Sequence, residues 1–503
     1  MVARIPRLVI AGLSGDSGKT IVSLAFLHAL RQKGYKPAVF KKGPDYIDSA
    51  WLARAADHVC RNLDTYLVEQ ALVRDIFIRR AFQSDIAVIE GNRGLFDGKD
   101  VAGTHSSAEL ALLLQAPVVL VVNVAKATRT VAAVVSGCLS FDSRLKVAGV
   151  ILNRVSGDRH GKIISESIEK YCRVPVLGRI PRLPDDCQLI PGRHLGLITP
   201  AEYTGGTNLD RQLLEIAGKH LDIDSLVGIA SAAPPLEQPV VDHEERPLSP
   251  RVRIGYFCDP VFTFYYPENL EALEHHGAQL VPVNSLEDSE LPDIDGLYIG
   301  GGFPETHAAR LADNRSLQMS VKQGSKQGLP VYAECGGLIF LSDKLIVNDN
   351  VYPMSGVFRV ELQLESKPVG HGYTSLRVDQ HNPFFEIDTF LRGHEFHYTG
   401  IRHGTEELAT CMNMQSGVGL GAGRDGLVSC RTLATYSHLH ASGAPRWAAA
   451  FAARAREYRW QRHSDNSNEY GEPESERETL WSSLTGIKER TVTRDLRPAR
   501  YVN

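Results

Sequence analysis

The stretch that decides the fold is Gly12-Leu13-Ser14-Gly15-Asp16-Ser17-Gly18-Lys19-Thr20, which directly follows the apolar run Leu8-Val9-Ile10. A buried strand, a glycine-rich loop and a helix that begins near Lys19 predict a phosphate-binding loop, whose backbone N–H groups face the phosphates. In such a loop Lys19 reaches the terminal phosphates and Thr20 can ligate Mg²⁺. We therefore expect a site for ATP and Mg²⁺. Its nucleotide-binding residues would be Gly12, Gly15, Ser17, Gly18, Lys19 and Thr20.

Apolar runs alternate with helical patterns around this loop, which indicates an α/β fold with a parallel sheet covered on both faces. The expected strands are 8–10, 37–40, 86–89, 118–122, 147–152 and 174–177, and an amphipathic helix at 209–221 closes this domain. A second α/β series begins with a strand at 252–257. It continues through strands at 296–299 and 330–333 and ends near His440.

The length of 503 residues is too great for one hydrophobic core. We expect an ATP-binding domain at 1–232, a Pro-rich linker at 233–251 and a second domain at 252–445. Residues 446–503 would form a charged, partly disordered tail, with a loose helix from Arg454 onward.

The composition excludes several classes of protein. The chain is 43% hydrophobic with a net charge of −4, which gives no electrostatic reason to expect nucleic acid or an anionic membrane as partner. The longest apolar run, 116–122, is too short to span a membrane, so we expect a cytoplasmic protein that binds small molecules. The eight cysteines show no metal-ligand spacing, and most should be buried thiols. The oligomeric state stays open, a homodimer included.

Two acidic loops follow expected strands, at 41–48 and 90–98. Because the carboxyl ends of parallel strands meet the nucleotide at one edge of the sheet, Asp45 and Glu90 should join Thr20 as Mg²⁺ ligands. The preceding Lys41 and Lys42 would serve phosphate. A single acidic loop is usually a solvated turn, but two such loops beside a phosphate loop favour the metal site.

The sequence Val331-Tyr332-Ala333-Glu334-Cys335-Gly336-Gly337 predicts a strand, a sharp turn and a helix, which is the geometry of a nucleophile elbow. The Gly336 N–H would face an oxyanion, and the helix N-terminus would lower the pKa of the Cys335 thiol. The glycine run at 300–305 is either the source of a second oxyanion donor or a plain turn. A cysteine that releases ammonia from glutamine, next to an ATP site that activates a carboxylate, suggests an ATP-dependent amidation.

The segments 40–48 and 90–98 resemble signatures of the cobyrinic acid a,c-diamide synthase family, glutamine-dependent enzymes that amidate acetate side chains of a tetrapyrrole. The resemblance spans about residues 5–442. It implies a dethiobiotin-synthetase-like P-loop domain followed by a class I glutamine amidotransferase-like domain, with an acyl-phosphate intermediate. In the family's pattern Asp45, Asp48, Glu90 and Asp97 serve metal coordination and the acyl-phosphate step. Asn153 resembles an adenine-reading asparagine, and a helix cap is the alternative.

The segment 436–438 resembles the family's Y-x-H signature, which implies His438 as the catalytic base and leaves His440 as the second choice. Class I glutaminases usually carry a glutamate two residues beyond the base, where this chain has His440. The resemblance therefore implies a Cys335–His438 dyad and names no group that orients the imidazole.

The segments 370–373 and 392–398 resemble family segments near the tetrapyrrole. Arg392, His394 and His397 would either pair with substrate carboxylates or belong to a β-hairpin. The pair Asn92-Arg93 departs from many family members, so cobyrinate ranks first as substrate, and siroheme or nickel-sirohydrochlorin second. A rival of another class is a nucleotide-switched scaffold related to partition ATPases, which would not amidate; Cys335 and the lack of a lysine at position 13 argue against it.

Overall fold

The computed structural model describes residues 2–183, 189–193, 196–237, 251–404 and 409–466. Residues 1–458 form one compact unit and residues 459–503 a second. Within the first unit we call residues 2–237 the first half and residues 251–458 the second half. Among the described helices, none combines the length and the hydropathy that a membrane crossing requires.

The first half is built on a seven-stranded sheet in which every neighbouring pair of strands is parallel. From edge to edge the strands are β4 (Cys60–Leu63), β3 (Pro37–Lys42), β5 (Ile86–Gly94), β2 (Arg7–Gly12), β6 (Val118–Asn123), β7 (Val147–Val155) and β8 (Val176–Pro181). The six expected strands are confirmed. Strand β4 was not expected, because its sequence is half polar.

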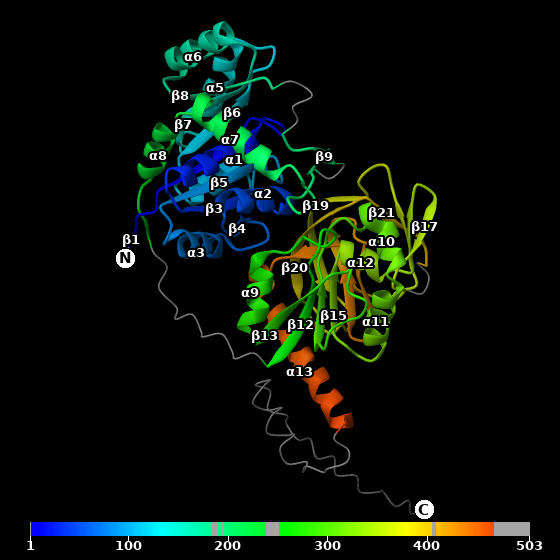
Figure 1. Ribbon diagram of the computed structural model, residues 1–503. Coiled ribbons are helices and arrows are strands. Elements are labelled where there is room, and N and C mark those ends of the chain that lie inside the picture. Colours follow the sequence, from blue (N-terminus) through cyan, green and yellow to red (C-terminus); the bar gives the residue numbers. More distant parts are fainter. Residues whose placement is uncertain (1, 184–188, 194–195, 238–250, 405–408, 467–503) are drawn as a thin grey trace, which may run out of the picture. The chain divides into compact units, whose positions relative to one another are not determined.

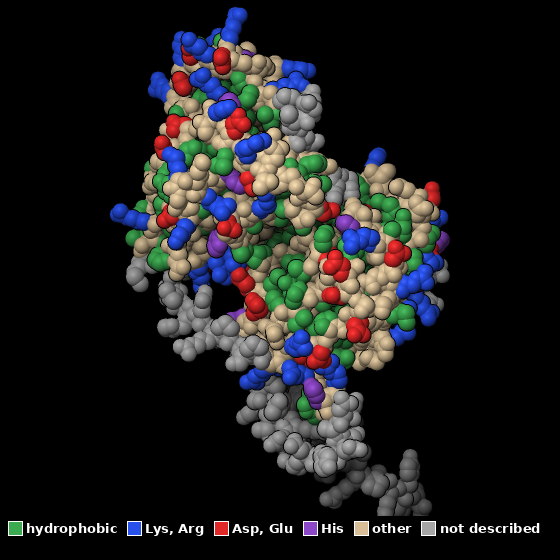
Figure 2. All heavy atoms as spheres, viewed as in Figure 1, with side chains coloured by type: hydrophobic (Ala, Val, Ile, Leu, Met, Phe, Trp, Pro, Cys, Tyr) green, Lys and Arg blue, Asp and Glu red, His purple; other side chains and the backbone are tan. Residues whose placement is uncertain are grey.

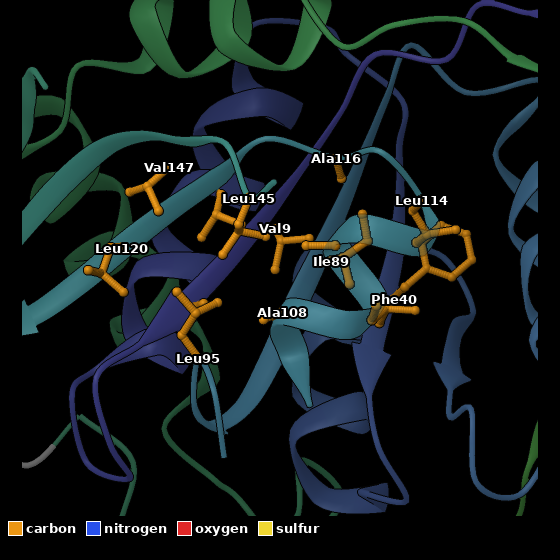
Figure 3. Packing of buried hydrophobic residues seen from close by; sticks show 14 of the residues in the cluster. Val9, Phe40, Ile89, Leu95, Ala108, Leu114, Ala116, Leu120, Leu145 and Val147 are labelled. Atoms are coloured by element: carbon orange, nitrogen blue, oxygen red, sulfur yellow. The ribbon is translucent and has the colours of Figure 1, made fainter. Parts of the chain in front are cut away.

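Helices cover both faces of this sheet (Figure 1). They are α1 (Lys19–Gln32), α2 (Tyr46–Ala56), α3 (Gln70–Ala81), α4 (Ser107–Leu113), α5 (Thr130–Phe141), α6 (Asp158–Cys172), α7 (Gly206–His220) and α8 (Ile223–Ser231). Side chains of β2 alternate between two cores: Leu8 and Ile10 pack with α1, α2, α7 and α8, whereas Val9 and Ala11 pack with α3 to α6. Figure 3 shows Val9 in the second of these cores. Burial on both faces explains the unbroken apolar strands.

The second half contains a ten-stranded mixed sheet. In order the strands are β13 (Ala278–Val283), β12 (Val252–Phe257), β14 (Gly296–Ile299), β15 (Val331–Glu334), β24 (Thr432–Thr435), β23 (Arg424–Ser429), β22 (Thr410–Ser416), β19 (Gly370–Val378), β20 (Phe390–His397) and β25 (His438–Leu439). The first five strands are parallel and the later pairs antiparallel. The strands expected at 252–257, 296–299 and 330–333 are confirmed as β12, β14 and β15.

Smaller sheets and short helices complete this half. A four-stranded sheet runs in the order β17 (Asn350–Pro353), β16 (Lys344–Val347), β18 (Glu361–Leu364) and β21 (Thr399–His403). The helices are α9 (Pro267–His275), η1 (Pro304–His307), α10 (Ala308–Asp313), α11 (Arg315–Lys326), α12 (Gly336–Leu341), η3 (Ala441–Gly443) and α13 (Arg446–Asn466). In the first half, two further strand pairs are β1 (Val2–Ala3) with β11 (Leu236–Glu237) and β9 (Gly192–Arg193) with β10 (Gly196–Leu197).

The expected linker and tail differ from the structure at their starts. Helix α13 begins at Arg446, before the expected helix, and its residues Trp447 and Phe451 are buried in the core, so the tail does not begin at residue 446. In the expected linker 233–251, residues 236–237 form strand β11. Residues 238–250 of the linker and 467–503 of the tail lie outside the described residues.

The cysteines also correct an expectation. Of the seven described cysteines, only Cys60, Cys335 and Cys411 are buried, so the prediction that most are buried thiols was wrong. All seven are free. On the face shown in Figure 2 basic and acidic side chains are interspersed, which agrees with the small net charge.

Candidate functional site

The phosphate loop joins β2 to α1 as expected. Gly18 caps α1 with φ +93°, a left-handed conformation that glycine adopts without strain. The Ser17 hydroxyl donates to the Ser14 carbonyl oxygen (2.9 Å) and accepts from the Ser14 N–H (3.2 Å). A Cβ on Gly12 would lie 2.9 Å from Ser17 Oγ. Gly12 and Ser17 therefore shape the loop, and neither lines the cavity in front of it.

A cavity of about 1470 Å³ opens at this loop and is lined by side chains of both halves. Its volume exceeds the roughly 300–1,000 Å³ of an ordinary small-molecule pocket, so it has room for more than one ligand. The residues that the sequence predicted and that line it are Gly15, Gly18, Lys19, Thr20, Lys41, Lys42, Asp45, Asp48, Asp97, Asn153, His394 and His438.

A buried lysine joins the acidic loops. Lys41, 1% exposed, donates through Nζ to Asp48 Oδ2 (2.6 Å) and Glu90 Oε1 (2.7 Å), and Asp45 Oδ2 lies 3.7 Å away. We expected Lys41 to serve phosphate. Carboxylates from three positions converge on its ammonium group, and its contact with phosphate stays a prediction.

One lysine does not neutralise three carboxylates, and the protonation of the cluster reflects this. Burial and the charge of Asp48 raise the pKa of Asp45 to about 7. Burial also acts to raise the pKa of Asp48, but Lys41 outweighs it and leaves the pKa of Asp48 below its usual value. Asp45 can therefore hold or release a proton near neutral pH.

The oxygen-bearing side chains beside Lys41 fit a hard cation such as the Mg²⁺ that accompanies ATP in P-loop proteins. Thr20 Oγ1 donates to Glu90 Oε1 (3.1 Å), whereas Glu90 Oε2 is buried without a hydrogen-bond partner. The described residues contain no group of three His, Cys, Asp or Glu side chains arranged to hold a metal ion. Mg²⁺ usually takes only one or two carboxylates and completes its shell with water and substrate phosphates, so Thr20 and Glu90 suit it.

Asn153 is hydrogen-bonded to the phosphate loop, and Asp97 is hydrogen-bonded to the end of strand β5. Asn153 Nδ2 donates to the Ser17 carbonyl oxygen (2.9 Å). Helix α6 has Gly157 as its N-cap, so the alternative of a capping asparagine is not observed. Asp97 Oδ2 accepts from the Gly94 N–H (2.8 Å), which holds its turn while the residue lines the cavity.

The cysteine elbow has the expected form. Cys335 lies between β15 and α12 with φ +48° and ψ −96°, a strained conformation for a residue with a side chain. A Cβ on Gly336 would stand 2.9 Å from the Gly302 backbone nitrogen. The glycine run at 300–302 therefore lies directly against the elbow, where a second oxyanion donor is needed.

The pKa of the Cys335 thiol corrects another expectation. Burial raises this pKa well above its usual value, and the charge of Glu305 adds to the rise. The Gly336 N–H acts in the opposite direction but is the weaker influence. The helix N-terminus therefore does not produce a standing thiolate, and the thiol needs a base to take its proton.

The two candidate histidines occupy different surroundings. His438 is 2% exposed, lines the cavity and stacks on His394 with ring centroids 4.8 Å apart. Its Cε1 would lie 2.4 Å from a Cβ on Gly301. His440 instead places Nε2 3.6 Å from Glu268 Oε2, and its Nδ1 accepts from the Ser442 N–H. Only His438 of these two borders the glycine run at the elbow.

The β-hairpin interpretation of the segment 392–398 is confirmed, whereas pairing of its residues with substrate carboxylates stays a prediction. Strands β19 and β20 pair antiparallel, as the hairpin reading expects. His397 is buried, with Nδ1 2.8 Å from the Thr399 carbonyl oxygen, and Arg392 pairs with Glu69 at 3.8 Å. His394 alone of the three lines the cavity, and burial lowers its pKa well below the usual value.

Sequence reasoning missed the aromatic and basic lining of the cavity. Tyr46 stacks on Phe264 (5.0 Å between ring centroids) and lies 5.3 Å from the His438 ring, so it joins the two halves. Arg93 Nη2 lies 3.2 Å from His371 Nε2. The position of Tyr46 directly after Asp45 was the only local signal for it.

Known proteins match both halves. Residues 8–191 match the family described as CobQ/CobB/MinD/ParA nucleotide binding domain, and residues 253–445 match the CobB/CobQ-like glutamine amidotransferase domain. A cobyrinate a,c-diamide synthase of Magnetococcus marinus is 40% identical over 89% of this chain and 97% of its own length. One of Archaeoglobus fulgidus is 39% identical over 87% of this chain and 94% of its own length.

Proposed function

The chain belongs to the cobyrinate a,c-diamide synthase family, and we propose that it converts acetate carboxylates of cobyrinate to amides through an acyl-phosphate. It is an amide ligase that takes its nitrogen from glutamine. One observation carries the proposed coupling of its two reactions. The same cavity is lined by Lys19 and Thr20 of the phosphate loop and by His438 beside the cysteine elbow.

The first half would activate the carboxylate. A substrate carboxylate oxygen attacks the terminal phosphorus of ATP, the bond to ADP breaks, and an acyl-phosphate remains. Lys19 would hold phosphate oxygens, and Thr20 and Glu90 would hold Mg²⁺, whose charge would offset that of the phosphates. Ammonia then attacks the acyl carbon and phosphate leaves. Asp45, whose pKa is raised to about 7, is suited to take the proton that the nitrogen loses.

The second half would release the ammonia. His438 takes the proton of the Cys335 thiol, the sulfur attacks the glutamine amide carbon, and the imidazolium returns the proton to the departing ammonia. The Gly336 N–H and an N–H of the glycine run would bind the oxyanion. Water then hydrolyses the thioester to glutamate. The raised pKa of Cys335 makes this base necessary.

The cavity lining supports a substrate with several carboxylates. Basic residues of the lining besides Lys19 and Lys41 are Lys42, Arg93, Lys99, Lys126, Arg154 and Arg182. Carboxylates of a tetrapyrrole and phosphates of ATP both need such partners. Arg93 belongs to the Asn92-Arg93 pair that pointed to siroheme or nickel-sirohydrochlorin, and it lines the cavity, so these tetrapyrroles are the alternative substrates to be tested.

Purified protein incubated with ATP, Mg²⁺ and glutamine should convert cobyrinate to its amides, detected by mass spectrometry. Siroheme and nickel-sirohydrochlorin in parallel reactions should give less product at equal concentration. Amidation of siroheme alone would move the substrate assignment to the alternative. Absence of any glutamine hydrolysis would favour the scaffold reading instead.

A further inference from the structure

The residue directly before the nucleophile faces the catalytic histidine. Glu334 ends strand β15, is 1% exposed, and places Oε2 3.6 Å from His438 Nδ1. Strand β15 runs parallel to β24, and Glu334 lies opposite Thr435. His438 is three residues beyond Thr435, so it lies at the same edge of the sheet as Glu334. His438 Nδ1 is buried without a hydrogen-bond partner.

We propose that Glu334 is the positioning acid of the glutaminase, holding the Nδ1–H of His438 so that Nε2 is free to take the Cys335 proton. This inference rests on the proposed role of His438 as base. The site would then have three members, Cys335, His438 and Glu334. The acid directly precedes the cysteine in the sequence, because the position two residues beyond the histidine is occupied by His440.

The Glu334 carboxylate is held in place by groups other than His438. Oε1 accepts from the Tyr332 hydroxyl (3.1 Å) and the Leu439 N–H (3.0 Å). Oε2 accepts from the Tyr298 hydroxyl (3.1 Å). A carboxylate oxygen can accept a second bond, so Oε2 has capacity for His438 Nδ1. The acid is thus fixed before the imidazole engages it.

The orientation of the imidazole agrees with this role. With Nδ1 toward Glu334, the opposite edge of the His438 ring lies against the glycine run, where Nε2 would be 3.3 Å from a Cβ on Gly301. That run borders Gly336, the residue after the nucleophile. A neutral imidazole with its proton on Nδ1 has its lone pair on Nε2, and the carboxylate stabilises the imidazolium formed when the thiol proton arrives. Catalytic hydrogen bonds are often long before substrate binds.

The other groups around His438 do not supply this function. His394 stacks on its ring, and Tyr46 lies 5.3 Å away between ring centroids. His440, which stands where class I enzymes usually place their acid, faces Glu268. Among these neighbours Glu334 is the carboxylate that faces Nδ1.

The test compares Glu334→Gln with Glu334→Asp and Tyr332→Phe. Glu334→Gln keeps the shape but loses the charge, so kcat for glutamine hydrolysis should fall about 10²–10⁴-fold with KM changed less than about threefold. Glu334→Asp keeps the charge and should recover part of kcat. Tyr332→Phe removes a donor to the oxygen that does not face His438, and its loss of kcat should be at least tenfold smaller.

A spectroscopic measurement separates positioning from support of the fold. Histidine side chains are observed by ¹⁵N NMR in protein labelled at histidine, and the signals of His438 are assigned by their absence in His438→Asn. In the wild type, His438 should carry its proton on Nδ1. In Glu334→Gln, His438 should lose this preference for Nδ1. Hydrolysis by Glu334→Gln within about threefold of the wild type, or a wild-type proton on Nε2, would overturn the inference. Equal losses of kcat in Glu334→Gln and Tyr332→Phe would also overturn the inference. A wild type without glutaminase activity would instead remove the proposed function itself.

Discussion

Arg61 Nη1 lies 2.9 Å from Glu268 Oε1, and this buried ion pair joins strand β4 of the first half to helix α9 of the second. Glu268 also places Oε2 3.6 Å from His440 Nε2. Burial acts to raise the pKa of Glu268, but His440 and Arg61 lower it to about 2. A chain of ionisable groups, Arg61, Glu268 and His440, thus runs from the first half to a residue two positions beyond the proposed base.

Arg61→Gln should lower the free energy of unfolding by about 3–5 kcal/mol, because Glu268 would stay buried without its cation. Arg80→Gln is the matched control, since Arg80 pairs with Glu271 as Arg61 does, but its side chain is 46% exposed. The control should cost less than about 1 kcal/mol. Urea denaturation of the three proteins measures the difference, and equal midpoints would show that the buried pair does not stabilise the fold.

Cys335→Ala should abolish glutamine-dependent amidation and leave amidation from ammonium salts, because only thiol chemistry is removed. Product formed with each nitrogen donor is the measurement. Loss of both activities in a folded variant would mean that Cys335 is not a dedicated glutaminase nucleophile.

His438→Ala should reduce glutamine hydrolysis about 10²–10⁴-fold, the usual contribution of a general base. His440→Ala should retain most turnover, because its imidazole faces Glu268 away from the glycine run. Glutamate release by both variants decides between them. The reverse ranking would identify His440 as the base.

Glu90→Gln should slow amidation severely with either nitrogen donor, because Glu90 is the buried acceptor that suits Mg²⁺ and also binds Lys41. Basal glutamine hydrolysis uses neither metal nor phosphate and should persist. The two rates are measured separately on the same preparation. Ammonia-dependent amidation near the wild-type rate would remove Glu90 from the activating site.

The raised pKa of Asp45 predicts how stability depends on pH. The folded protein holds this proton up to about pH 7, whereas an unfolded aspartate releases it near pH 4, so between these values the folded state binds more protons. The free energy of unfolding should therefore fall as pH rises through this window, by roughly 1–3 kcal/mol. Asp45→Asn keeps the cap on α2 and should lack this decline. Urea denaturation of both proteins at several pH values is the test.

Much of the fold could be predicted because the determining signals are local. The central parts of strands β2, β5 and β6, residues 8–11, 86–89 and 118–122, are buried on both faces and continuously apolar. Strand β4 was missed because its polar residues find partners far away in sequence: Arg61 pairs with Glu268, and Asn62 donates to the Gly43 carbonyl oxygen. The residues within four positions of Arg61 and Asn62 in the sequence do not indicate these contacts.

The functional site likewise contains parts that local sequence predicts and parts that it does not. The phosphate loop before α1 and the cysteine elbow before α12 follow from short spacings, and the structure confirms the local geometry of both. The surroundings of Lys41 could not be predicted, because three carboxylates converge on it only in the folded chain. The relation of Glu334 to His438 was hidden for the same reason, since 104 positions separate residues that the sheet brings to one edge.

In the proposed reaction, nucleotide and tetrapyrrole would share the cavity that both halves line. Each bound ligand would then form part of the wall that the other meets, and its presence would alter the affinity for the other. Thermodynamic linkage would make this effect reciprocal: the factor by which nucleotide changes tetrapyrrole affinity would equal the factor by which tetrapyrrole changes nucleotide affinity. Neither affinity would then be a property of one half alone.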